Sequence, residues 1–171
     1  MSQAHKHVLW CLNKAKKELS EKGKHRGLII ATPDLEKAAG HITKAEHNLA
    51  AISYFDKGGF SDWSASAAFY AMYHCFLAIL AKFGYESRNQ ECTISAVEYL
   101  KEQGKIELDE RFILALKSEV QEMSEQRIID LREYYQYSVK TNVEDEEKIK
   151  KLVEISSEMI DAAKEIIYEK K

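Results

Sequence analysis

The sequence contains very few residues that break helices. It has one proline and seven glycines among 171 residues. Folds built of many short strands need frequent turn residues, so this scarcity argues against an all-β fold and favours long helices. Hydrophobic residues make up 45% and charged residues 31% of the chain. These values are typical of a globular protein and argue against a disordered one. The length fits one domain.

Cysteine is also scarce. Cys11, Cys75 and Cys92 are odd in number and lack the paired spacing of a disulfide framework or a metal site. We expect no signal peptide, because a basic and polar start precedes only a short apolar run. We therefore expect a reducing, cytoplasmic environment with no disulfide framework.

The chain lacks the overall basic excess that is usual in nucleic-acid-binding proteins, since its formal net charge is −3. Positive charge is concentrated at the N-terminus, where residues 1–26 hold seven basic and two acidic side chains. Residues 144–171 hold nine acidic and six basic side chains. Any contact with a polyanion is therefore local, and the best candidate is the run that contains Lys24 and Arg26. A solvated linker has the same composition, so both interpretations remain open.

No charged residue occurs between Trp63 and Ala81, a stretch long enough to raise the question of a membrane span. This stretch also contains serine, tyrosine and histidine and many alanines, and Asp62 rather than a basic residue precedes it. We interpret it as a buried core helix and expect no membrane contact. Because the helix is apolar on all sides, we expect neighbouring helices and a second copy of the chain to hide it.

Apolar spacing predicts six helical segments that form one all-α bundle around the helix at 63–81. The first segment covers about 3–19 and a polar, basic linker follows at 20–31. Capping signals at Thr32 and Pro33 start the second segment, which carries an apolar stripe from Leu35 to Phe55 and ends at Gly58. We assign residues 1–31 to the N-terminal helix and linker and residues 32–171 to the bundle.

The remaining segments follow the uncharged helix. The third ends at Gly84 and the fourth covers about 90–103. The fifth begins at Asp109 and continues past an expected kink to Tyr135, and the last has its cap at Asn142. Apolar positions in the fifth segment include Phe112, Ile113, Leu116, Val120 and Met123, with the kink at Ser124.

Several ordered features resemble the HEPN family. The tract from Ser61 to Leu80, with the turn at Gly84-Tyr85, resembles the signature helix of HEPN domains. The preceding helix, 44–59, fits the same pattern. The segment Asp130-Leu131-Arg132-Glu133-Tyr134-Tyr135 is similar to the arginine-containing segment of the family. The resemblance covers roughly residues 34–168.

The resemblance implies an up-and-down helical bundle that commonly dimerises. Many members of the family are metal-independent ribonucleases, often toxins paired with a nucleotidyltransferase-fold antitoxin, and others are non-catalytic modules that bind RNA, nucleotides or proteins. Catalytic members carry an arginine followed four to six residues later by a histidine. The imidazole removes the proton of the ribose 2′-OH while the arginine holds the phosphate.

This sequence lacks that histidine, because none follows Arg127 or Arg132 and no histidine occurs after His74. We therefore predict a non-catalytic or degenerate module of a two-component system. It would act as a homodimer that binds RNA, a nucleotide or a nucleotidyltransferase-fold protein. One alternative is a ribonuclease toxin in which His74 supplies the base near an arginine. The other is a structural dimer or adaptor without a ligand.

The candidate ligand-binding side chains are two arginines, three tyrosines and two basic linker residues. The arginines can bind phosphate, or they can form ion pairs with Glu119, Glu122, Asp130 or Glu133. The tyrosines can stack on a base, serve as modified tyrosines, line a dimer interface or pack in the core. His41 and His47 are six residues apart, which is wrong for sharing a metal on one helix face, so we expect no metal site and no cofactor. The candidates for RNA or nucleotide binding are Arg127, Arg132, Tyr134, Tyr135, Tyr137, Lys24 and Arg26, and the catalytic candidates are Arg127, Arg132 and His74.

Overall fold

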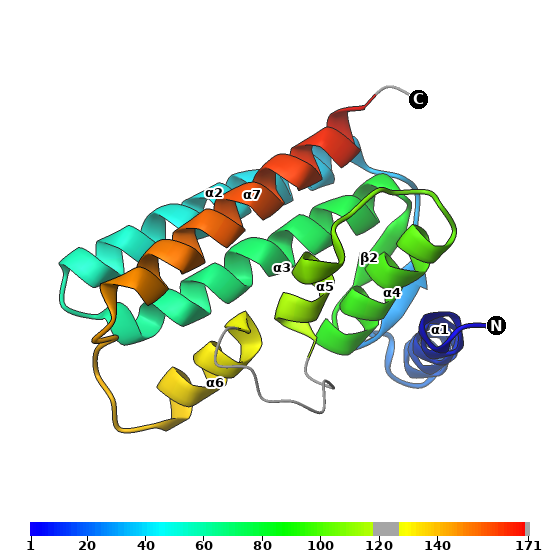
Figure 1. Cartoon of the computed structure of the whole chain (residues 1–171). Helices are drawn as coiled ribbons and strands as arrows, with labels where there is room; N and C mark the ends of the chain where they lie inside the picture. Colours follow the sequence, from blue (N-terminus) through cyan, green and yellow to red (C-terminus); the bar gives the residue numbers. More distant parts are fainter. Residues whose placement is uncertain (118–126, 170–171) are drawn as a thin grey trace.

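The structure is a computed structural model that describes residues 1–117 and 127–169 (Figure 1). Most of its described residues are helical and only two short strands occur among them, which confirms the all-α prediction. The elements are α1 (Gln3–Lys22), β1 (Leu28–Ile30), α2 (Leu35–Lys57), the 3-10 turn η1 (Ser61–Trp63), α3 (Ser64–Lys82), β2 (Tyr85–Ser87), α4 (Gln90–Glu102), α5 (Glu110–Leu116), α6 (Ile128–Tyr137) and α7 (Glu146–Tyr168).

Three long helices form the centre of the molecule. α2 and α3 form a helical hairpin around the turn at Gly58-Gly59, and α7 packs against both (Figure 1). The predicted apolar stripe of α2 provides much of this contact, because Ala38, Ile42, Ala45 and Ile52 are buried. Leu35 is the exception and is exposed. α4 and α6 add further cover to α3.

The uncharged segment forms α3, the most buried helix of the bundle. Among the described residues, Ser61–Lys82 is the one stretch long and apolar enough to cross a membrane, but most of it is buried inside the protein. This burial is consistent with a soluble protein. One stripe of the segment stays open in the single chain, because Trp63 is 55% exposed and Tyr70 is 44% exposed. Cover of this stripe by a second copy remains a prediction.

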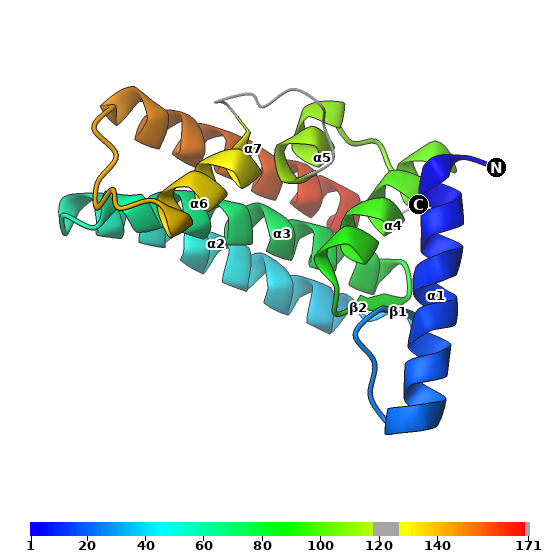
Figure 2. The same cartoon turned by 90° about the horizontal axis from the view of Figure 1, so that it is seen from below.

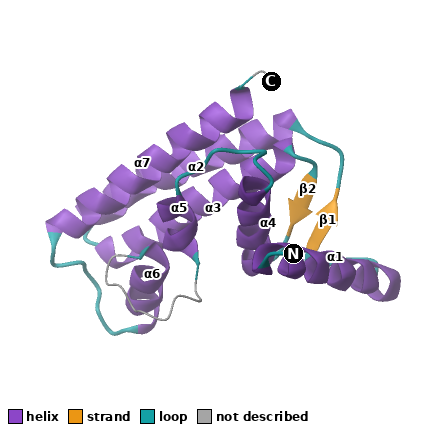
Figure 3. Cartoon of the chain, turned by 45° about the vertical axis from the view of Figure 1, so that its right-hand side comes forward, coloured by secondary structure: helices purple, strands orange, loops and turns teal. Residues whose placement is uncertain are grey.

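The segment predicted to be a linker contains a strand that sequence analysis missed. β1 pairs with β2 in an antiparallel register, with Leu28 opposite Ser87 (Figure 3). Leu28 is fully buried, and the Ala31 N–H extends the pairing by donating to the Gly84 carbonyl at 2.8 Å. A strand of three residues is too short to show an alternating pattern, so its composition resembled that of a loop.

α1 packs its small side chains against α4 and β1 (Figure 2). Its buried residues are Ala4, Val8, Cys11 and Ala15. A disulfide joins Cys11 to Cys92 of α4, so the prediction of no disulfide is wrong. The two cysteines are 81 residues apart, and only the packing of α1 on α4 brings them together.

Several predicted helix ends are also wrong. α1 continues to Lys22, three residues beyond Leu19. α2 is capped by Asp34, whose carboxylate accepts from the Lys37 N–H at 2.8 Å, and not by Thr32. α7 is capped by Asp145 in place of Asn142. In both cases the aspartate lies closer to the apolar stripe that packs on the core, and that packing determines where the helix begins.

The fifth predicted helix corresponds to two separate helices, α5 and α6. Lys117 and Arg127 both have extended backbone, so a single helix from 109 to 135 is wrong. The residues predicted to continue or kink this helix lie outside the described residues. So do two of the proposed ion-pair partners of the candidate arginines. These residues are Glu119, Val120, Glu122, Met123 and Ser124.

Candidate functional site

The two candidate arginines of the α6 region have different surroundings. Arg127 precedes α6 and forms a bidentate ion pair with Asp130, with nitrogen–oxygen distances of 2.6 and 2.9 Å. Its Nη1 donates to the Lys117 carbonyl at 3.2 Å. The side chain is only 11% exposed. Arg127 therefore uses its donors to connect the end of α5 to the start of α6, and few of them remain for a ligand.

Arg132 has no such acidic partner. Its guanidinium carbon lies 4.3 Å from the ring centre of Phe69 and 5.5 Å from that of Tyr70, both on α3. Its Nε is buried without a hydrogen-bond partner, and the side chain has no hydrogen bond or ion pair with any described residue. A guanidinium has five N–H donors, so Arg132 retains donors for a phosphate or carboxylate. We call Arg132, Phe69 and Tyr70 the arginine platform.

The three tyrosines of α6 do not form one cluster. Tyr135 is partly buried and packs against the hydrophobic core, and burial raises the pKa of its hydroxyl. Tyr134 contacts the Tyr135 ring edge-on but is 53% exposed, and Tyr137 is 79% exposed. The structure thus divides the tyrosines between core packing and free surface.

His74 lies one helical turn beyond Tyr70 on α3, and thus on the same side of the helix as part of the arginine platform. Its Nδ1 is 3.0 Å from Nδ1 of His41 on α2. Burial lowers the pKa of His74, and burial, His74 and Lys37 together lower the pKa of His41 to about 4. Both rings are therefore neutral at pH 7, and one Nδ1–H donates to the other ring. This bond connects α2 to α3.

Lys24 and Arg26 lie far from the arginine platform. They precede β1 near the C-terminal end of α3, whereas α6 contacts η1 at the opposite end (Figure 2). Both residues are exposed. The structure therefore separates the predicted binding residues into two groups.

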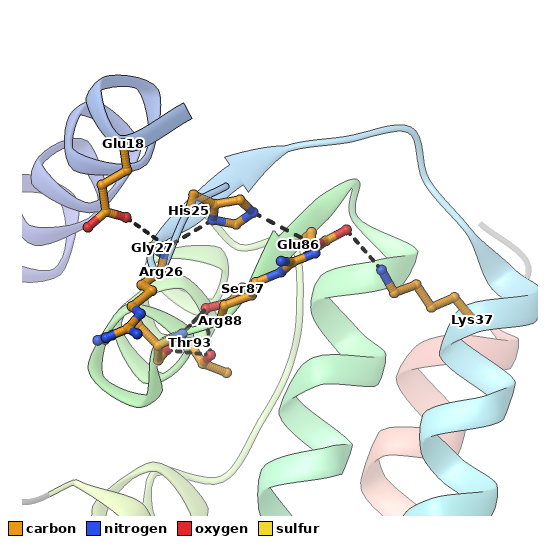
Figure 4. A network of polar contacts seen from close by, with 10 residues as sticks. Glu18, His25, Arg26, Gly27, Lys37, Glu86, Ser87, Arg88 and Thr93 are labelled. Carbon is orange, nitrogen blue, oxygen red and sulfur yellow. Dashed lines mark hydrogen bonds and ion pairs between the residues drawn. The ribbon is translucent and has the colours of Figure 1, made fainter. Parts of the chain in front are cut away.

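A network of polar contacts lies beside β1 (Figure 4). Glu86 on β2 pairs with Lys37 at 3.1 Å and with Arg88 at 3.0 Å. The hydrogen bond from Lys37, assisted by Arg88, lowers the pKa of Glu86. The backbone N–H of Arg26 donates to the Glu18 carboxylate at 2.6 Å. These contacts join residues of the chain to one another, and the side chains of Lys24 and Arg26 take no part in them.

Sequence reasoning missed the aromatic half of the arginine platform. Phe69 and Tyr70 fell within the HEPN-like tract, and Arg132 fell within the HEPN-like arginine segment, but nothing in the sequence placed one against the other. No three histidine, cysteine, aspartate or glutamate side chains lie close enough to hold a metal ion within the described part of the chain.

The HEPN domain model matches residues 38–167, which includes the arginine platform, His41 and His74. This chain belongs to the HEPN family. A comparison with curated proteins gave no match. α1 and β1 precede the matched region.

Proposed function

We propose that this HEPN protein is a non-catalytic binding module whose arginine platform binds the phosphate of an RNA or a nucleotide. The observation that carries this proposal is the guanidinium of Arg132, which lies on two aromatic rings with no acidic partner among the described residues. A planar guanidinium binds a phosphate through two parallel hydrogen bonds.

The proposal excludes cleavage because no base is available next to Arg132. The six residues that follow it are Glu133, Tyr134, Tyr135, Gln136, Tyr137 and Ser138, none of which is a histidine. The Nδ1 atom of His74 is already hydrogen bonded to His41. The ribonuclease alternative therefore depends on the remaining nitrogen of His74, one turn from Tyr70.

Replacement of Arg132 by alanine should weaken binding of single-stranded RNA about tenfold or more, because a hydrogen bond to a charged group contributes about 1.5–3 kcal/mol. Fluorescence anisotropy with labelled RNA measures this change. Arg111→Ala is the matched control, since Arg111 lies 4.7 Å from the Phe112 ring but is paired with Asp109 and Glu158. Equal affinity of R132A and wild type would disprove the proposed site. Cleavage of the RNA by wild type, lost in R132A, would establish the ribonuclease alternative.

We also propose that the open stripe of α3 is covered by a second copy of the chain. Trp63 and Tyr70 lie seven residues apart, which places them on the same side of the segment, and both are about half exposed in the single chain. Exposed aromatic residues in this arrangement are typical of an interface. A nucleotidyltransferase-fold protein, as in HEPN toxin–antitoxin pairs, is a further proposed partner.

Trp63→Glu should convert the protein from a dimer to a monomer, because a carboxylate would be buried without a partner in the interface. Light scattering after size exclusion should give twice the chain mass of 19.7 kDa for wild type and the single-chain mass for the variant. Tyr54→Glu on α2, at a residue that is 76% exposed, should remain dimeric. A monomeric wild type at tens of micromolar would refute this interface.

A further inference from the structure

The outer face of α1 has no role in the fold or in the proposed arginine platform. The inner stripe of α1 is buried against α4 and β1, whereas Trp10 on the outer face is 52% exposed. Its ring stacks beside His7, and the Nζ of Lys14 lies 5.0 Å from the ring centre. An exposed tryptophan with a lysine against its ring is therefore held on a long helix.

The basic side chains of α1 and of the segment that follows it are largely unpaired. Among the lysines and the arginine of residues 1–26, Lys17 alone has an ion pair with a described residue, Glu21 at 3.9 Å, and both side chains are mostly exposed. Glu18, the other acid of this segment, accepts from the backbone of Arg26. The remaining basic side chains have no ion-pair partner among the described residues: Lys6, Lys14, Lys16, Lys22, Lys24 and Arg26.

α1 is held firmly enough to present these groups as one surface. The disulfide between Cys11 and Cys92 fixes the middle of the helix to α4. His7 Nδ1 is 2.7 Å from the Ser95 hydroxyl near the N-terminal end. At the other end, the Arg26 N–H donates to Glu18, and β1 pairs with β2.

We propose that the outer face of α1, formed by Trp10 with Lys6, Lys14, Lys16 and Lys17, binds single-stranded nucleic acid. An unpaired base stacks on the indole ring while the lysines contact neighbouring phosphates, the combination by which proteins bind single strands without sequence preference. This surface is distinct from the arginine platform, because α1 and α6 lie at opposite ends of the molecule (Figure 2).

Charge and burial favour a nucleic acid over a membrane surface. A helix that binds a membrane inserts a continuous apolar face into the lipid. The apolar stripe of α1 is used up by packing against α4 and β1, and Leu9, Trp10 and Leu19 are the large apolar residues of α1 that remain exposed. Unpaired bases offer flat rings to the tryptophan, and the phosphates match the unpaired lysines.

The test measures binding of a labelled 20-nucleotide single-stranded RNA by anisotropy between 50 and 200 mM salt. Trp10→Ala should weaken binding about tenfold, in line with the loss of one stacked base. The double variant Lys16→Ala/Lys17→Ala should flatten the plot of log affinity against log salt by about 1.4, since each lost phosphate contact on a single strand changes the slope by about 0.7. Tyr168→Ala and Lys150→Ala/Lys151→Ala, which alter exposed residues of α7, should bind like wild type.

Comparison with Arg132→Ala separates this surface from the proposed function. Loss of affinity in W10A, with further loss when R132A is added, supports two independent contacts. If R132A weakens binding but W10A and the lysine variant do not, the α1 surface is overturned and the arginine platform stands. A second experiment tests cosedimentation of the protein with phosphatidylserine vesicles. If W10A abolishes cosedimentation but leaves RNA binding unchanged, the proposal is overturned in favour of lipid.

Discussion

Reduction of the Cys11–Cys92 disulfide is expected to lower the free energy of unfolding by about 4 kcal/mol, because the bond closes a long loop and restricts the unfolded chain. The two cysteines are 81 residues apart, and the loop between them includes β1, α2, α3 and β2. For a chain of this size, a loss of that magnitude corresponds to a fall of roughly 10 °C in Tm. Urea unfolding with and without a reductant measures the difference directly.

Two variants provide the controls for this experiment. Cys11→Ala/Cys92→Ala should unfold like reduced wild type and should not respond to reductant. Cys75→Ala should still respond, because Cys75 is a buried free thiol and burial raises its pKa to about 12. Alkylation of the denatured, unreduced protein should label one cysteine of the three. Labelling of all three in freshly purified, air-exposed protein would show that the bond does not form.

Replacement of Gly84 by alanine should destabilise the protein by about 3 kcal/mol, from a strained backbone and a steric clash together. Gly84 ends α3 with φ +76°, a conformation that costs about 1–2 kcal/mol for a residue with a side chain. A Cβ at this position would lie 2.7 Å from the Ala31 carbonyl oxygen and 3.2 Å from the Pro33 ring. The backbone would have to move away from Gly84, which would break the hydrogen bond between Ala31 and Gly84.

Gly104→Ala separates the two causes of this loss. Gly104 also has a positive φ, of +63°, but a Cβ there would meet nothing within 4 Å. We therefore expect G104A to lose only the stability that a side chain at positive φ costs, about 1 kcal/mol. Thermal unfolding followed by circular dichroism measures both. Equal losses in the two variants would show that the contact between Gly84 and the Ala31–Pro33 segment contributes nothing.

The helices that could be predicted from sequence are those with a long pattern of apolar residues. The uncharged stretch predicted α3, and the apolar stripe predicted α2 with its end at Gly58. β1, by contrast, is three residues long and is stabilised by hydrogen bonds to a strand more than fifty residues away. The disulfide likewise depends on packing between α1 and α4, which no spacing of cysteines reveals.

The candidate site was only half predictable for the same reason. The sequence offered Arg127 and Arg132 as equivalent phosphate ligands near several acids. The choice between them depends on geometry: Asp130 is three residues from Arg127 and pairs with it across the first turn of α6, whereas Arg132 turns toward the aromatic rings of α3. Helical spacing permitted the first contact, but the second joins residues more than sixty positions apart.

Because β1 pairs with β2, the folded core extends beyond the residues that the family model matches. The family match starts at residue 38, yet Leu28 is fully buried and belongs to the same hydrophobic core as α3. A fragment trimmed to the matched residues would expose one edge of β2 and leave a gap where Leu28 packs. A shortened or fused form of this protein should therefore begin before β1, so that the strand stays with the bundle.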